Sequence, residues 1–113
     1  MNISKKIFIL SLILTVSFNV GCDNSPVSKG NRYLSKKSYD KAIVQYQKAL
    51  EVDSKDPKAY LGLSEVYSGK GDIAEAMDMI RKGLEENPED EDLQKAQLRI
   101  FGTLSEMMEQ FSY

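Results

Sequence analysis

The sequence predicts an all-α protein built from helix-turn-helix repeats, and three observations lead to that fold class. Residues 23–56 match residues 57–90 at an offset of 34. Small and aromatic side chains recur at matching places in the two segments, as they do where paired helices pack closely. Helix-start signals stand where each helix should begin. The identical aligned pairs are Tyr33 with Tyr67, Lys36 with Lys70, Ala42 with Ala76, Lys48 with Lys82, Leu50 with Leu84, Glu51 with Glu85 and Asp56 with Asp90.

The first 21 residues are predicted to be an export signal that is removed from the mature protein. Lys5 and Lys6 precede an apolar run over residues 7–20, and Gly21 is a small residue before the cut. The run is shorter than the roughly 20 residues that a membrane-spanning helix needs. A buried core helix is the alternative for a run of this length. The position beside the paired lysines favours the signal.

Cys22 is the only cysteine of the chain and directly follows this run. Gly21 and Cys22 resemble the lipobox of bacterial lipoproteins, in which the cysteine is acylated and becomes the first mature residue. A lone cysteine cannot form an intramolecular disulfide, and acylation would explain its presence in an exported protein. Asn19 departs from the pattern, so a secretory signal cut near Gly21 is the alternative. The resemblance implies a lipid anchor, a tether over residues 22–25 and, from Asp23, a preference for the inner membrane.

The mature chain is predicted to be one small acidic domain. Removal of the signal leaves 13 basic side chains against 17 acidic ones, a formal charge of −4. This balance disfavours nucleic acid or anionic lipid as the main ligand. The chain has no histidine, and an acylated Cys22 leaves no free thiol, so the commonest general base and the best nucleophile are missing. We therefore expect no enzyme activity, no cofactor and no metal site.

The first three helices are predicted at residues 26–37, 39–53 and 57–70. Ser25 and Asp56 are suited to start the first and the third of them. Each offers a side-chain oxygen to free backbone N–H groups, and each is followed by proline, which fits the first helical position.

The last two helices are predicted at residues 73–86 and 90–110. A turn with two glycines precedes the first of them, and Asp72 with Glu75 three residues later resembles a capping box. Asp90 supplies the start of the final helix.

The second unit carries residues at fixed places: Tyr60, Leu63, Tyr67, Gly71, Ala76, Leu84 and Pro88. These places and the 34-residue period resemble the tetratricopeptide repeat, a helix-turn-helix unit that stacks into a right-handed superhelix. Ser64, Ile80 and Gly83 replace the usual residues with others of similar size. The first unit departs at Pro26 and at Lys29, where the family has leucine, so its first helix is expected to be short at the front.

The final helix is expected to cap the stack. Stacked repeats leave one apolar end face, which a terminal helix covers. A partner-binding surface on the same helix is the alternative. The predicted domain therefore spans residues 26–113, with units at about 23–56 and 57–90 and a capping helix at about 90–111. The face of this helix that we expect to be buried carries Leu93, Gln97, Ile100, Leu104, Met107 and Phe111.

The resemblance also implies a concave groove, lined by the first helix of each unit, that holds segments of partner proteins. Co-chaperone members of the family clamp a C-terminal carboxylate there, but only Asn31 matches that pattern here and Asp92 would repel a carboxylate. The alternative for each groove residue is an ordinary solvated surface position. The predicted groove residues are Val27, Asn31, Leu34, Lys58, Leu61, Gly62, Glu65, Lys95 and Arg99.

These features together predict a membrane-anchored adaptor for protein–protein interaction in the bacterial cell envelope. Its partner is expected to be an envelope protein or peptide segment, and its N-terminal lipid is expected to contact the membrane. We expect no nucleic acid and no small-molecule substrate. The alternative is a pilotin-like factor that assists pilus or secretion assembly.

Overall fold

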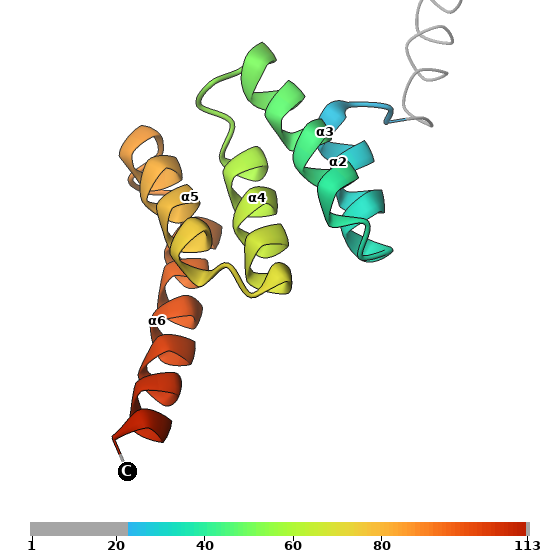
Figure 1. Ribbon diagram of the computed structural model, residues 1–113. Helices are drawn as coiled ribbons and strands as arrows, with labels where there is room; N and C mark the ends of the chain where they lie inside the picture. Colours follow the sequence, from blue (N-terminus) through green and yellow to red (C-terminus); the bar gives the residue numbers. More distant parts are fainter. Residues whose placement is uncertain (1–22, 113) are drawn as a thin grey trace, which may run out of the picture.

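The computed structural model describes residues 23–112, so Cys22 and the predicted export signal lie outside the described residues. Within them the chain forms helices and no strand, which confirms the predicted all-α repeat fold (Figure 1). The helices are α2 (Pro26–Ser35), α3 (Tyr39–Val52), α4 (Pro57–Lys70), α5 (Ile73–Glu86) and α6 (Glu91–Phe111).

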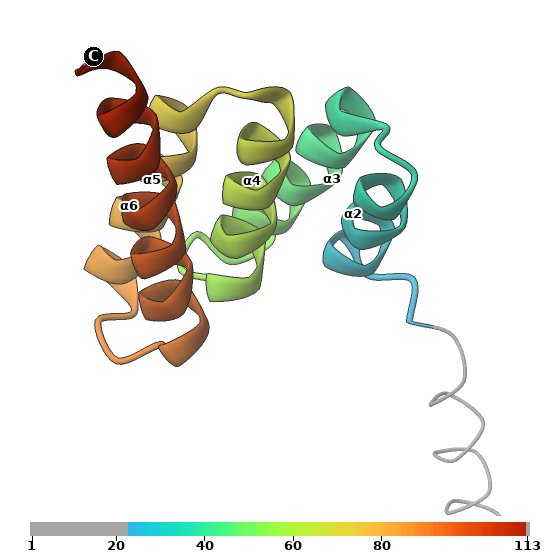
Figure 2. The ribbon, with the colours of Figure 1, turned by 90° about the horizontal axis from the view of Figure 1, so that it is seen from below.

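The helices form two layers. Helices α2 and α3 pair as the first unit, and α4 and α5 pair as the second. Helix α4 contacts α2 and α6, so the first helices of successive units form one layer, while α3 and α5 lie behind them (Figure 2). This arrangement gives the inner face that the repeat predicts.

The turns of the two helical hairpins have the same backbone hydrogen bond and the same left-handed position. The Ser38 amide donates to the Tyr33 carbonyl over 2.9 Å, and the Asp72 amide donates to the Tyr67 carbonyl over the same distance. Each turn contains one left-handed residue, Lys37 in the first and Gly71 in the second. The predicted first helix ends early, at residue 35, because the left-handed backbone two residues later cannot continue it.

Among the helices of residues 23–112, side-chain caps occur only at the first helix of each unit and at α6. The side chains of Ser25, Asp56 and Asp90 accept hydrogen bonds from the backbone at the starts of α2, α4 and α6. Asp72 makes no such bond, which corrects the predicted capping box with Glu75. Its ψ of 71° is far from the extended value of a side-chain cap, because the Asp72 amide is held in the turn.

The core of the first unit is centred on Tyr46. This side chain is fully buried and lies in a cluster with Ala42, Leu63 and Val66. Gly30 of α2 and Gly62 of α4 have no side chain, and the Tyr46 ring fills the space against their backbones. Tyr46 therefore joins three helices and both units.

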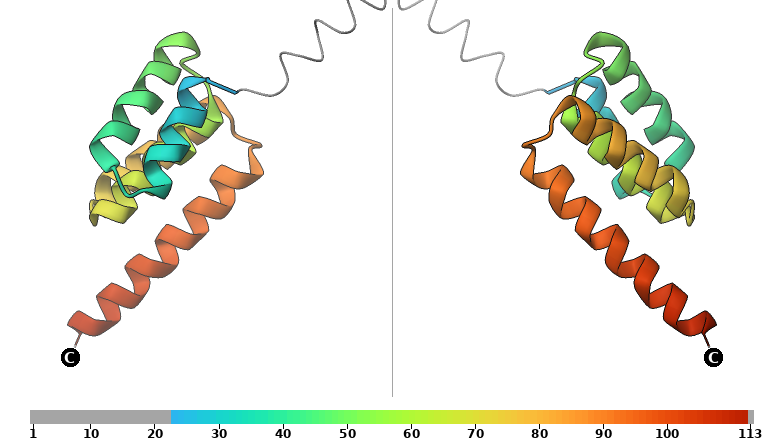
Figure 3. Two further views of the ribbon diagram at one scale, coloured as in Figure 1. Left: turned by 90° about the vertical axis from the view of Figure 1, so that its right-hand side faces the viewer. Right: turned by 90° about the vertical axis from the view of Figure 1, so that its left-hand side faces the viewer.

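A second cluster attaches α6 to the stack. Leu93 and Ala96 are buried with Ile80 of α5. Beyond residue 100 the helix projects past the others (Figure 3), and its apolar side chains are largely exposed, with Met107 at 43% and Phe111 at 87%. The predicted cap is therefore correct for the first half of α6 and wrong for the second half, because α5 is only 14 residues long and α6 is 21.

Candidate functional site

The inner layer contains a polar cavity of about 250 Å³ between α4 and α6. It brings together Glu65 and Arg99, two of the predicted groove residues, from helices that are separate in the sequence. A carboxylate and a guanidinium at one opening can bind both polar ends of a peptide group or a charged side chain of either sign. The other lining residues are Ser64, Ser68, Ala96, Ile100 and Thr103.

Asn31 lies at the other end of the inner layer, on α2. The Tyr46 hydroxyl donates to Asn31 Oδ1 over 2.6 Å. Burial, together with the negative charge of Glu65, raises the pKa of Tyr46 to about 12, so the hydroxyl keeps its proton at neutral pH. Because Oδ1 is occupied, the amide nitrogen of this exposed side chain is the group available to a partner's carbonyl oxygen.

Lys58 and Lys95 stand on the exposed surface of α4 and α6. Lys95 forms an ion pair with Glu91 over 3.7 Å, and both side chains are well exposed. An exposed pair of this kind adds little stability and opens readily. Both lysines therefore remain accessible to a partner.

Four predicted groove residues take part in packing, and one of them, Val27, is half-buried against the cluster around Tyr46. Gly62 is buried against Tyr46, so it does not line an open groove as predicted. Leu34 and Leu61 are half-buried and pack against the two core clusters. The sequence pattern did not reveal this because the partner of Gly62 lies 16 positions earlier, on another helix.

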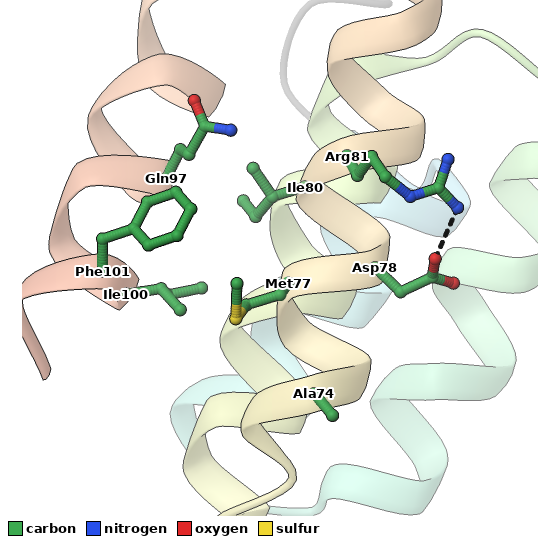
Figure 4. Close-up of a pocket in the computed structure, with 8 residues that line it drawn as sticks. All are labelled: Ala74, Met77, Asp78, Ile80, Arg81, Gln97, Ile100 and Phe101. Carbon is green, nitrogen blue, oxygen red and sulfur yellow. Dashed lines mark hydrogen bonds and ion pairs between the residues drawn. The ribbon is translucent and has the colours of Figure 1, made fainter. Parts of the chain in front are cut away.

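A larger, mostly apolar cavity of about 420 Å³ opens between α5 and α6, which the groove prediction did not include. Met77 and Ile80 of α5 face Ile100 and Phe101 of α6 (Figure 4). Arg81 bonds Asp78 at its edge over 2.6 Å. The repeat register could have predicted this cavity. Helix α6 starts 34 residues after α4 and is therefore the first helix of a third unit, but in the described chain no second helix follows it as α5 follows α4.

Asp23, the predicted sorting residue, is structured at the start of α2. Its carboxylate accepts hydrogen bonds from the Ser28 hydroxyl over 2.6 Å and from the Ser25 amide over 3.0 Å. These bonds lower the pKa of Asp23 to about 2. The side chain is therefore ionised at any physiological pH, and its hydrogen bonds hold Asp23 against the start of α2.

Residues 23–112 hold no cluster of carboxylates or other ligands suited to a metal ion. Every buried side-chain nitrogen or oxygen in this range has a hydrogen-bond partner. None of the helices there is both long enough and apolar enough to cross a bilayer.

Comparison with known proteins supports the repeat. A family model described as tetratricopeptide repeat matches residues 33–100. The mitochondrial import receptor subunit TOM70 of Saccharomyces cerevisiae is 41% identical over 61 residues, which are 54% of this chain and 10% of that protein. FK506-binding protein 5 of Rhizopus delemar is 36% identical over 74 residues, which are 66% of this chain and 17% of that protein. The chain thus spans only a small part of either relative.

Proposed function

The chain belongs to the tetratricopeptide repeat family, and we propose that it is a membrane-anchored adaptor that binds a segment of another protein on its inner face. The family generally serves protein–protein interaction, and one relative is named as an import receptor subunit. The observation that carries the proposal is the inner layer itself. It brings Asn31 of α2, Glu65 of α4 and Arg99 of α6 onto the layer shared by the first helices.

The described groove is short, because it is made from three helices. A short groove offers few contacts, so binding by this surface alone is expected to be weak. An anchor would offset this weakness by raising the local concentration of the groove at the membrane. The proposed lipid on Cys22 supplies that anchor, and Asp23, the next residue, is hydrogen-bonded at the start of α2, so the anchor would hold this helix close to the membrane.

Site-specific photo-crosslinking in intact cells tests the groove. A photoreactive residue at position 65 and one at position 99 should capture the same protein, since both side chains line one cavity. The matched control is position 75, where Glu75 is exposed on α5 in the other layer. Capture of that protein from position 75 with equal yield would contradict the groove.

A charge reversal sharpens the test. Glu65→Lys and Arg99→Glu should each abolish the crosslink from the other position, and circular dichroism should show an unchanged helix content because both residues are exposed. Unchanged crosslinking in both variants would exclude the polar cavity as the contact point.

Mass spectrometry of the mature N-terminus tests the anchor separately. The proposal expects a mature chain that begins at an acylated Cys22. An unmodified thiol, or a cut at another residue, would exclude the lipoprotein while leaving the groove open.

The pilotin-like alternative differs in its consequence for the cell. Such a factor would deliver a pilus or secretion subunit, so its deletion should mislocate one assembled envelope complex. An adaptor without this role would leave those complexes at normal abundance and position. No residue contact in the structure favours the alternative over the adaptor.

A further inference from the structure

Charge is divided unevenly along the stack. The first unit, residues 23–56, has seven basic and five acidic side chains, whereas residues 57–113 have six basic and twelve acidic ones. Within the first unit, residues 24–39 contain four basic side chains and no acid. The negative net charge of the mature chain therefore conceals a basic end at α2.

The repeat register shows where these charges lie. Lys29 and Arg32 occupy the places that Leu63 and Val66 hold in α4. Those two side chains are almost fully buried against Ala42 and Tyr46 of the preceding unit. No described unit precedes α2, so the face of α2 that corresponds to the buried face of α4 lies at the outer end of the stack. Lys29 and Arg32 are on that outer face.

Solubility explains a charged outer end but does not explain its sign. The outer surface of a terminal repeat must be polar, and acidic side chains would serve equally well in this acidic protein. The other end of the stack does use acids, since the exposed half of α6 carries Glu106 and Glu109 and no basic residue. The basic residues of α2 therefore point to a partner of negative charge.

The spacing places Lys29 and Arg32 on one face of α2, and Lys36, the C-cap residue of this helix, continues that face. We define these three residues as the basic face. Positions three and seven residues apart share one side of a helix. None of the three forms an ion pair among residues 23–112. The face begins about 6 Å along the helix from Ser25 and continues for about 10 Å more.

We propose that the basic face of α2 lies against an anionic lipid bilayer. The location rests on the proposed anchor at Cys22, which holds the start of α2 at the membrane. A basic patch beside a lipid anchor adds an electrostatic attraction to an anionic bilayer surface. In this orientation α2 lies along the membrane surface, and α6, at the opposite end of the stack, is directed away from it (Figure 1).

Vesicle partitioning tests this surface. The protein isolated from membranes is transferred to vesicles of phosphatidylcholine, with and without phosphatidylglycerol, and the bound fraction is compared. Each basic residue near an anionic surface should raise partitioning about fivefold. The ratio of anionic to neutral binding should therefore fall at least about tenfold in a Lys29→Gln, Arg32→Gln variant and should shrink at high salt.

The matched control changes the same charge elsewhere. Lys82→Gln with Lys95→Gln removes two positive charges from α5 and α6, and it should leave the ratio unchanged. Equal losses in the two variants, or a wild-type ratio near one, would overturn the basic face. A missing lipid anchor would give a different result. Neutral vesicles would then bind no protein, while anionic vesicles would still bind it. Binding to neither kind of vesicle would overturn both.

The acetylation rates of single lysines in the vesicle-bound protein provide a second test of the orientation. Lys29 and Lys36 should react several-fold more slowly on anionic vesicles than on neutral ones, because the bilayer covers them. Lys82 should react equally on both. Equal rates for all three lysines would overturn the proposed orientation.

Discussion

Gly62 is a packing residue, and its replacement should weaken the fold. A Cβ at this position would overlap the ring of Tyr46, and the backbone of Gly30 also lies close against this ring, so the ring has little room to move. We expect Gly62→Ala to lower the free energy of unfolding by about 1–3 kcal/mol, as overpacked cores do. Urea denaturation measures this change.

The matched control is Gly102→Ala. A Cβ there meets no atom within 4 Å, and the residue lies inside helix α6. Alanine should raise stability by about 0.5–1 kcal/mol, since glycine is a poor helix former. The packing explanation of Gly62 fails if both substitutions have the same sign.

Lys37 adopts a backbone conformation that suits glycine. Its φ is +57°, and its repeat partner Gly71 has a φ of +84°. The left-handed region costs other L-residues about 1–2 kcal/mol, and the greater unfolded-state entropy of glycine offsets part of this. Lys37→Gly should therefore raise stability by roughly 0.5–1 kcal/mol. Gly71→Lys should lower it by a similar amount, because no atom crowds that site. Opposite signs in urea denaturation are the decisive result.

Tyr46 should make stability fall at alkaline pH. Its folded-state pKa is about 12, which is above the ordinary value of 10.0 because of burial and Glu65. A raised pKa gives a contribution that is complete below pH 10 and is lost as the pH rises toward 12. The midpoint temperature of thermal unfolding should therefore fall more steeply between pH 10 and pH 12 for the wild type than for Tyr46→Phe. Parallel curves would show that Tyr46 is not the group responsible.

At the scale of the helix, the starts of α4 and α5 differ although both begin after aspartate. Asp56 accepts a hydrogen bond from the Lys58 amide over 3.0 Å, whereas Asp72 caps nothing with its side chain. Both carboxylates favour the positive end of their helix. Asp56→Ala should therefore lower the free energy of unfolding by about 1 kcal/mol more than Asp72→Ala, which is the value of a cap. Equal losses in chemical denaturation would mean that the charge alone matters.

The helix boundaries were predictable because caps and turns are local signals. Asp56 and Asp90 mark their starts through side-chain oxygens close in the sequence, and the structure uses both. The role of Asp72 was not predictable, because the hairpin turn sets its ψ angle. Glu65 and Arg99 line one cavity, between the two helices that the repeat register assigned to the same layer. The prediction that Gly62 lines the groove was wrong because its burial depends on the ring of Tyr46 from another helix.

Residues 23–112 form one packed unit from which the second half of α6 projects. Tyr46 joins the two repeats through a shared cluster, so neither repeat can open without exposing that cluster. Helix α6 belongs to the stack only through its first half, where Leu93 and Ala96 are buried. Stability should therefore be shared between the repeats and fall toward the end of α6, as expected of a stack in which each unit contacts its neighbours.

Native-state hydrogen exchange measures this gradient. Amides of α3, α4 and α5 should exchange at similar, slow rates, because they share buried contacts. Amides of residues 102–111 should exchange at least ~100-fold faster than those of residues 93–100, because most of their side chains are exposed. The measurement should be repeated at a tenfold higher protein concentration. Slow exchange throughout α6 at both concentrations would contradict the gradient. Slowing only at the higher concentration would show that a second copy covers the exposed half of the helix.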